Sequence, residues 1–457
     1  MVSIADLAPT LQRLLTTAAD AAARASGMIQ RQGKVTGARF VQTCVFGWLA
    51  RPDASLSELA QTAATCGLAI SPQGLDQRFT AAAAAGLKAV LEAAMREVVA
   101  AAPVALPLLG RFNGVWLWDS TTITLPDALA AVWPGCGGRV ATNTRAALKV
   151  QVRWEFTTGR LELTDLQPGR GSDKAAADAA TPLPAGALRI TDLGYVSLAR
   201  LRALTARGVL ALCRLPAHVV VFDAAGRRWE AARLLARRGA GVEVVDLDVE
   251  LGVAERVPCR LVARRVPPEV AARRRRQWRK AARREGRAVS KARLALAAWD
   301  AYLTTAPRTQ LAAEEALVLV KARWQIERLF KLWKQHGHLD AWRSARPWRI
   351  LCEVYAKLLA LLIQHWCLLL RCWADPCRSL VKAAAVVRAH AVTLAAARGA
   401  VERLADALAV LADTLASAGR VTTRRERPPT ARQLLALTLA PTDEDLAFDT
   451  VEASWAA

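Results

Sequence analysis

The segment Arg323-Trp-Gln-Ile-Glu327-Arg-Leu-Phe330-Lys-Leu-Trp-Lys334 carries the most information in this 457-residue chain. It contains no Gly or Pro and favours good helix formers, so we predict a helix. At about 100° per residue, Arg323, Glu327 and Lys334 fall on one stripe about 16 Å long. A carboxylate between two cations suits a site that holds a divalent ion beside a nucleic-acid strand. A solvated face with an Arg323–Glu327 ion pair is the alternative interpretation.

The composition indicates a polyanionic partner. The formal net charge is +23 and 53% of the residues are hydrophobic. Such an excess of positive charge attracts nucleic acid at long range, although membrane-surface or ribosomal association also fits it. The hydrophobic content argues against long disorder, and the length predicts two to four folded units.

Neither secretion nor a membrane span is expected. The first twenty residues contain Asp6 and Asp20 and lack the apolar core of a signal peptide. The best candidate span, Ile350 to Leu370, contains Glu353 and Lys357, so we predict a buried helix instead.

The nine cysteines predict reduced thiols in a cytosolic protein, because their number is odd and their spacing shows no pairs. His365, Cys367, Cys372 and Cys377 cluster, but their spacing is not that of a usual zinc site.

Residues 1–105 are predicted to form a helical N-terminal domain. Ser55 and Ser71-Pro72 each mark the start of a helix. A helix, a Gly-containing turn and a second helix with Gln73, Gln77 and Arg78 are compatible with helix-turn-helix DNA binding. An ordinary helical hairpin is the alternative.

Residues 106–215 are predicted to form the first part of an α/β domain with a mixed sheet. Three strands are followed by alternating helices and strands. Two acids, Asp119 and Asp192, each follow an apolar run that we expect to be a buried strand. Ligands gather at the carboxyl ends of strands in open α/β sheets. Either residue could instead be a helix cap or turn former.

Residues 216–304 are predicted to be an insertion with short strands and a basic helix. Between Arg273 and Arg293 there are eleven basic residues and one acid, Glu285. We expect this helix to contact DNA phosphates, the alternative being a solvated face. The cations assigned to that contact are Arg273, Arg274, Arg275, Arg276, Arg279 and Lys280.

Residues 305–345 are expected to return to the α/β domain with its last strand and the Glu327 helix. Residues 346–457 are predicted to be a helical C-terminal region, whose Leu- and Ala-rich stripes suit packing or dimerisation. Asp119, Asp192 and Glu327 together form a candidate set of three carboxylates. Such a set can bind two Mg²⁺ ions for phosphoryl transfer on a nucleic-acid backbone.

These motifs resemble those of the DDE transposases of the fourth insertion-sequence family, over roughly residues 35 to 370. The matching motifs are Asp119-Ser-Thr-Thr, Asp192-Leu-Gly-Tyr195 and the block Arg-x3-Glu-x6-Lys at Arg323, Glu327 and Lys334. Gly169-Arg-Gly-Ser-Asp173 and the segment from Trp299 to Pro307 also look like the family.

The resemblance implies a ribonuclease-H-like core with a β-rich insertion and helical regions at both ends. It implies that Asp119, Asp192 and Glu327 are catalytic metal ligands for two Mg²⁺ ions, for which Mn²⁺ can substitute. Arg323 and Lys334, with Lys331 in the same block, would hold DNA phosphates. The implied activity is cleavage at transposon ends and strand transfer into target DNA by a homodimer, in the bacterial cytosol at the nucleoid.

The chain departs from the family at Val320, where the third block normally begins with Tyr. That Tyr is not a metal ligand, so the three acids are unaffected, but strand positioning and full activity are in question. Two alternatives therefore stay open: a nuclease of the same fold that does not join strands, and a catalytically decayed DNA-binding derivative. Trp324 lies off the charged stripe and is expected to pack.

Overall fold

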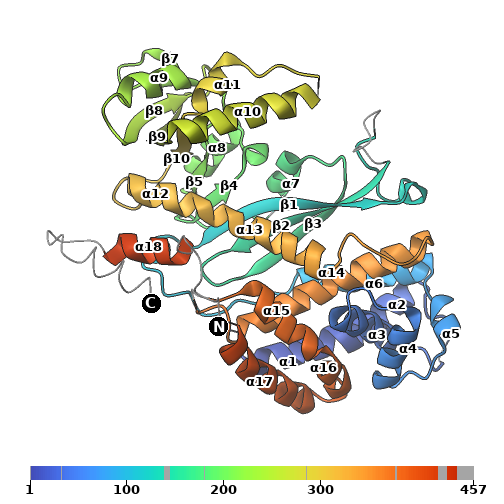
Figure 1. Ribbon diagram of the computed structural model, residues 1–457. Coiled ribbons are helices and arrows are strands. Elements are labelled where there is room, and N and C mark those ends of the chain that lie inside the picture. The colour runs from blue at the N-terminus through green and yellow to red at the C-terminus, as the bar shows by residue number, and fades with distance from the viewer. Residues whose placement is uncertain are drawn as a thin grey trace. The chain divides into compact units, whose positions relative to one another are not determined.

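The computed structural model describes residues 2–31, 33–137, 145–179, 181–284, 286–375, 378–419 and 430–439. The chain divides into two compact units (Figure 1). Unit 1 comprises residues 1–104, 116–182 and 324–423, and unit 2 comprises residues 105–115, 183–323 and 424–457. Cys377, Glu285 and the Arg-rich stretch from Thr422 to Pro429 lie outside the described residues.

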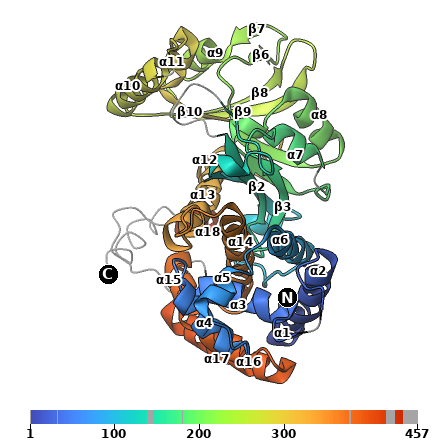
Figure 2. The same ribbon diagram turned by 90° about the vertical axis from the view of Figure 1, so that its right-hand side faces the viewer.

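Helices from both ends of the chain pack together in unit 1. The early helices are α1 (Ile4–Arg13), α2 (Ala19–Ala25), α3 (Gly37–Ala50), α4 (Leu56–Thr65), α5 (Pro72–Asp76) and α6 (Ala81–Met95). The late helices are α14 (Pro347–Leu369), α15 (Leu380–Ala389), α16 (Ala391–Ala397) and α17 (Val401–Ala418). Helix α14 packs on α3 and α6, α16 packs on α3, and α17 packs on α1 (Figure 2). The DNA-binding and dimerisation roles expected of the two helical regions stay predictions.

Local capping explains where the early helices begin. Ser55 caps α4 and forms a capping box with Glu58, as its sequence position predicts. Ser71 caps α5, with Pro72 in the first turn. Helix α5 is only five residues long, so Gln77 and Arg78 lie beyond it, contrary to the expected second helix. The helix-turn-helix role stays a prediction.

Helix α14 is long and apolar enough to cross a membrane by length and composition alone, but its apolar window is wholly buried within the protein. It carries a buried ion pair, because Lys357 Nζ lies 2.7 Å from Glu353 Oε1. The same ammonium donates to the carbonyl oxygens of His338 and Ala341. All three donors of this buried cation are therefore satisfied, as a core position requires. The predicted buried helix is confirmed.

Three antiparallel strands complete unit 1, in the order β3-β2-β1. Their bounds are β1 (Val115–Leu125), β2 (Ala146–Glu155) and β3 (Leu161–Pro168), followed by α7 (Asp173–Ala179). Gly159, in the turn between β2 and β3, has a φ of +75°, and a Cβ there would lie 2.5 Å from Trp373. Only glycine fits this turn, because the backbone is left-handed and the indole is in contact.

Among the described residues, unit 2 contains seven strands in the order β4-β5-β10-β9-β8-β6-β7. Strands β4 and β5 are parallel, with α8 between them in the chain, and the other pairings are antiparallel. The strand bounds are β4 (Leu188–Thr191), β5 (Leu210–Arg214), β6 (Val220–Asp223), β7 (Arg228–Glu230), β8 (Val244–Leu251), β9 (Val257–Arg265) and β10 (Trp299–Thr304). The predicted mixed α/β class is confirmed.

The helices of unit 2 include one that the sequence analysis missed. Their bounds are α8 (Leu198–Ala206), α9 (Ala231–Arg238), α10 (Pro268–Arg284), α11 (Lys291–Leu296), α12 (Ala313–Leu319) and α18 (Thr430–Leu439). Helix α9 falls where only strands were expected. Its buried Leu234 and Leu235 join a hydrophobic core of unit 2, which decides the structure of this short segment.

The stability of unit 1 should depend on pH through His365. Its Nε2 lies 2.7 Å from Gly159 O, and burial lowers its pKa to about 4 from 6.5. The unfolded chain binds a proton below pH 6.5 that the folded protein binds only near pH 4. We therefore expect the free energy of unfolding to decrease by about 3 kcal/mol in total as the pH is lowered from 6.5 to 4.

Urea denaturation of the wild type and of His365→Gln at several pH values checks this expectation. The glutamine retains a donor for Gly159 O but does not titrate. The wild type should lose stability relative to the variant as pH falls from 6.5 to 4. A difference between the two proteins that does not change with pH would contradict the role of His365.

Candidate active site

Asp119 lies within strand β1, not at its end. The strand continues from Val115 to Leu125, so the predicted strand-end position of Asp119 is wrong. The polar run Asp119-Ser-Thr-Thr122 stays extended because each residue pairs with one of β2, from Val152 to Lys149. Asp119 is partly exposed, and its Oδ1 accepts the Ser120 amide N–H at 2.8 Å.

The pleat of β1 determines which way Asp119 faces. Side chains alternate along a strand, and directly paired residues share a face. Asp119 pairs with Val152, and Leu117 on the same face pairs with Trp154. The Trp154 ring lies 5.9 Å from that of His365 on α14. Asp119 therefore points to the face of the sheet that the later helices cover.

Glu327 lies on helix α13 (Trp324–Lys331), where it is partly exposed. Ile326, Leu329 and Phe330 bury the opposite side of the helix. After Lys331 the backbone continues as a π-turn, Leu332–His336, and Lys334 Nζ donates to the carbonyl oxygen of Thr122 at 2.9 Å. This bond holds the end of the Glu327 helix against β1, and Thr122 lies three residues from Asp119. The structure thus brings together the strand of Asp119 and the helix of Glu327.

The block from Arg323 to Lys334 is not one regular helix, so the predicted single stripe is wrong. Val320–Arg323 forms a 3₁₀ turn, and Lys334 lies in the π-turn. Neither segment has the 3.6 residues per turn of an α-helix, so both cations are shifted around the axis relative to Glu327. Arg323 belongs to unit 2, whereas Glu327 and Lys334 belong to unit 1.

Trp324 does not pack, contrary to expectation. Its side chain is 52% exposed at the first residue of α13, and Lys331 Nζ lies 5.6 Å from the ring centroid. The helical periodicity of the charged residues did not predict a solvent-facing Trp one turn from Glu327. The position of Trp324 next to Arg323 in the motif was the feature that could have indicated it.

Asp192 follows β4 directly, so its predicted place at a strand end is confirmed. It precedes a 3₁₀ turn, Leu193–Tyr195, but its side chain makes no capping bond. Asp192 belongs to unit 2. Within the described ranges, no group of three or more His, Cys, Asp or Glu side chains is placed to hold a metal ion. Convergence of the three acids therefore stays a prediction.

Asp173 forms a polar network on the reverse face of β1. It is the acid of Gly169-Arg-Gly-Ser-Asp173 and the first residue of α7. Its Oδ1 accepts bonds from Gln151 Nε2 (2.7 Å), Ser120 Oγ (3.1 Å) and Lys149 Nζ (3.2 Å). Asp173 thus fastens the residue next to Asp119 to strand β2. The sequence motif marked this segment without revealing its partners.

The basic residues of α10 divide into two sets. Arg274 donates to Asp300 Oδ1 at 2.7 Å, and Arg275 donates to Leu294 O at 3.1 Å. These two arginines hold the helix on β10 and α11, and their contact with DNA stays a prediction. The other predicted contacts are exposed: Arg273, Arg276, Arg279 and Lys280.

Comparison with known proteins identifies the family. The transposase DDE domain matches residues 111–363, more than half of the chain. The chain therefore belongs to the transposase DDE domain family.

The relatives are transposases of bacterial insertion sequences. The transposase for insertion sequence element IS231C of Bacillus thuringiensis subsp. berliner is 27% identical over 362 residues, which cover 75% of each chain. The transposase for IS231F of Bacillus thuringiensis subsp. israelensis is 27% identical over 378 residues, 77% of this chain and 78% of the relative. The transposase for IS1151 of Clostridium perfringens is 23% identical over 369 residues, 75% of this chain and 76% of the relative.

Removal of the Asp173 carboxylate should loosen β1. Asp173→Ala leaves the buried Gln151 and the part-buried Lys149 and Ser120 without this acceptor. This loss should lower the free energy of unfolding by about 1–3 kcal/mol. Asp173→Asn retains an acceptor oxygen and should lose less. Urea denaturation of the two variants at neutral pH measures the difference, and no loss in Asp173→Ala would show that the accepted bonds contribute nothing.

Proposed function

We propose that this protein is the transposase of an insertion sequence and acts by cleavage at the element's ends and strand transfer into target DNA. The observation that supports this best is the Lys334–Thr122 bond, which holds the Glu327 helix against the Asp119 strand. Both belong to motifs within the matched DDE domain. The ribonuclease-H-like core is part of the proposal. Its support is the chain order: three antiparallel strands, then two parallel strands around α8.

The three acids fit a magnesium site by the chemistry of their donors. Asp119, Asp192 and Glu327 would hold two Mg²⁺ ions, or Mn²⁺ in their place, through carboxylate oxygens. The Asp119 carboxylate accepts a backbone N–H through Oδ1, and a carboxylate has about four lone-pair sites, so coordination is compatible with that bond. When bound, such ions activate a water or a 3′-hydroxyl and stabilise the leaving oxygen.

The basic residues of the block would position the DNA. Lys334 uses one donor on Thr122 O and lies 3.9 Å from Asp340 Oδ2. An ammonium has three donors, so Lys334 can bind a phosphate and remain fastened to β1. Lys331 is exposed one turn after Glu327, and Arg323 is partly exposed. These cations would hold the strand near the cleaved bond, because charge-assisted bonds to phosphate are strong and directional.

The proposed partners are the terminal repeats of the element and a target duplex, bound by a homodimer in the bacterial cytosol. The net charge of +23 supports DNA as the partner, because it favours encounter with a polyanion.

One residue favours a second candidate, a catalytically decayed DNA-binding derivative. Val320, where the family has Tyr, is 8% exposed at the start of the 3₁₀ turn and offers no hydroxyl. Such a derivative would bind the terminal repeats but not cleave them. A nuclease of the same fold would cleave but not join strands.

Asp119→Asn should abolish Mg²⁺-dependent cleavage at the terminal repeats and leave binding to them within about threefold. The carboxamide keeps the size and the bond to the Ser120 N–H, but it lacks the charge that a hard cation requires. Gel assays of nicking and of end binding measure the two properties on one preparation. Cleavage retained by the variant would defeat the assignment of Asp119.

A strand-transfer assay with pre-cleaved ends separates the alternatives. Joined product excludes a plain nuclease, and wild-type binding without nicking or joining indicates the decayed derivative. Glu327→Gln is the matched second variant, because it also removes one charge without changing the shape of the side chain.

A further inference from the structure

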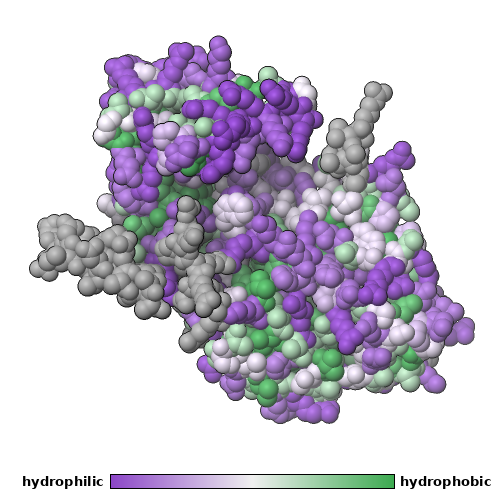
Figure 3. Space-filling view, in the orientation of Figure 1, coloured by the Kyte–Doolittle hydropathy of each residue, from purple (hydrophilic) through white to green (hydrophobic). Residues whose placement is uncertain are grey.

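Helix α10 presents a surface of six exposed cations that the proposed chemistry does not use. We define the outer face of α10 as this set: Arg273, Arg276, Arg279, Lys280, Arg283 and Arg284. Five of them, all except Arg273, cluster together along one side of the helix. The surface over this part of unit 2 is strongly hydrophilic (Figure 3).

The helix is held rigidly enough to present this face. Arg274 bonds to Asp300 at 2.7 Å and to Trp299 O at 3.3 Å, and Arg275 bonds to Leu294 O. Ala271 is buried at the base of the helix. The Arg293 guanidinium, from α11, lies 5.4 Å from the centroid of the Trp278 ring. These contacts fix which side of α10 faces outward.

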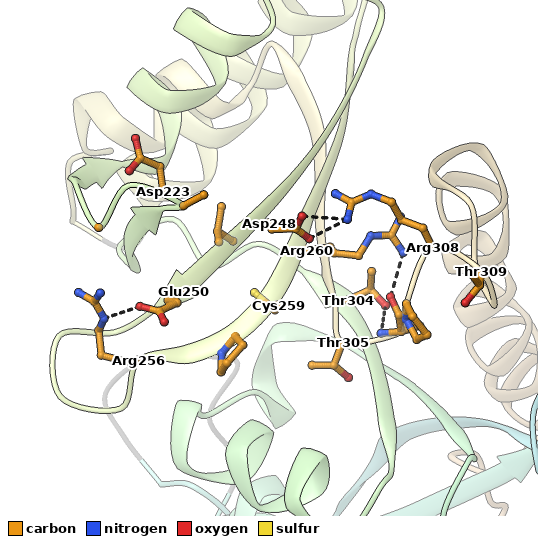
Figure 4. A pocket seen from close by; sticks show the side chains of 16 residues that line it. Asp223, Asp248, Glu250, Arg256, Cys259, Arg260, Thr304, Thr305, Arg308 and Thr309 are labelled. Carbon is orange, nitrogen blue, oxygen red and sulfur yellow. Dashed lines mark hydrogen bonds and ion pairs between the residues drawn. The ribbon is translucent and has the colours of Figure 1, made fainter.

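The positive charge of the outer face is not neutralised within the described part of the chain. None of its six cations lies within 4.0 Å of a carboxylate there. Three acids of unit 2, Asp223, Asp248 and Glu250, instead line a separate cavity of about 580 Å³ (Figure 4). There, Arg308 lies 2.8 Å from Asp248 and Arg256 lies 2.6 Å from Glu250. Charge is thus separated between two surfaces of unit 2.

The spacing of the cations suits a duplex backbone. Cations at intervals of three or four residues, such as Arg276, Lys280 and Arg283, lie about 4.5–6 Å apart along a helix that rises about 1.5 Å per residue. A duplex carries one charge per about 1.7 Å of its axis, so each cation can meet a different phosphate.

The outer face offers little with which to recognise sequence. Between Arg273 and Arg284 the exposed residues are the six cations, Ala281 and Gln277, whose amide is the one neutral polar group among them. Phosphate contacts carry no sequence information, whereas base-edge contacts do. A partner that must be held regardless of its sequence fits this chemistry better than a terminal repeat that must be distinguished.

We propose that the outer face of α10 binds the phosphate backbone of the target duplex, independently of its sequence. This inference rests on the proposed function, because that function is what identifies the bound duplex as target DNA. The binding itself can be measured without catalysis, so the two can fail separately.

The test is a variant with Arg276→Gln, Arg279→Gln, Lys280→Gln and Arg283→Gln in the full-length protein. Fluorescence anisotropy with a random-sequence duplex at several salt concentrations should show the salt slope reduced by roughly 3–4, at about 0.9 per phosphate contact. Binding to a terminal-repeat duplex in excess competitor DNA should change less than threefold. Joining of pre-cleaved ends to target should fall at least tenfold, with cleavage retained.

A second set of substitutions controls for net charge. The control variant removes the same charge from other exposed positions of unit 2, by Arg202→Gln, Arg207→Gln, Arg228→Gln and Arg238→Gln. Its salt slope should stay within about one of the wild-type slope. Replacing Arg276, Arg279 and Arg283 by Lys keeps the cations and should retain the wild-type slope, which makes the test independent of any folding defect in the Gln variant.

Three results would overturn the proposal. An unchanged slope in the α10 Gln variant would mean that this face does not contact DNA. An equal fall in the control variant would mean that the effect is one of overall charge. Loss of terminal-repeat binding to the same extent as random-duplex binding would assign the face to the transposon end. A wild type that binds random duplex but neither cleaves nor joins defeats the proposed function alone, since the slope still reports on α10.

Discussion

The pleat of strand β1 is the constraint on which the candidate site depends. Because successive side chains point to opposite faces, Asp119 and Ser120 cannot share an environment. Asp119 faces the helix-covered side, where Lys334 fastens the end of the Glu327 helix to Thr122 O. Ser120 faces the reverse side, where Asp173 gathers three donors. A shift of one residue in the pairing with β2 would exchange these roles and remove Asp119 from the helix of Glu327.

Residues with strong local signals were predicted correctly from the sequence. Ser55 and Ser71 cap helices because their side chains bond backbone N–H groups within one turn, a local interaction. The alternation after Leu148 identified β2, and the apolar run before Asp192 identified β4. The α/β class and the basic helix followed from the same kind of pattern, whereas the DDE motifs were identified by their resemblance to a known family.

What the sequence could not predict depends on tertiary contacts. The extent of β1 beyond Asp119 follows from its pairing with β2, which no local propensity of Asp-Ser-Thr-Thr encodes. The predicted stripe of Arg323, Glu327 and Lys334 required 3.6 residues per turn throughout, but a π-helical segment begins at Leu332. Arg274 and Arg275 are indistinguishable in sequence from their neighbours, and only the positions of Asp300 and Leu294 O show that they face inward.

The burial of helix α14 has a consequence for how this protein can be divided. Its apolar surface is as extensive as that of a membrane span, and α3 and α6, from the first hundred residues, cover part of it. Ribosomal synthesis produces these two helices some 250 residues before their partner. A fragment that ends near residue 105 would leave both without their cover, and a fragment that begins near residue 346 would expose α14. Neither terminal region is a self-sufficient module that recombination could transfer to another protein by itself.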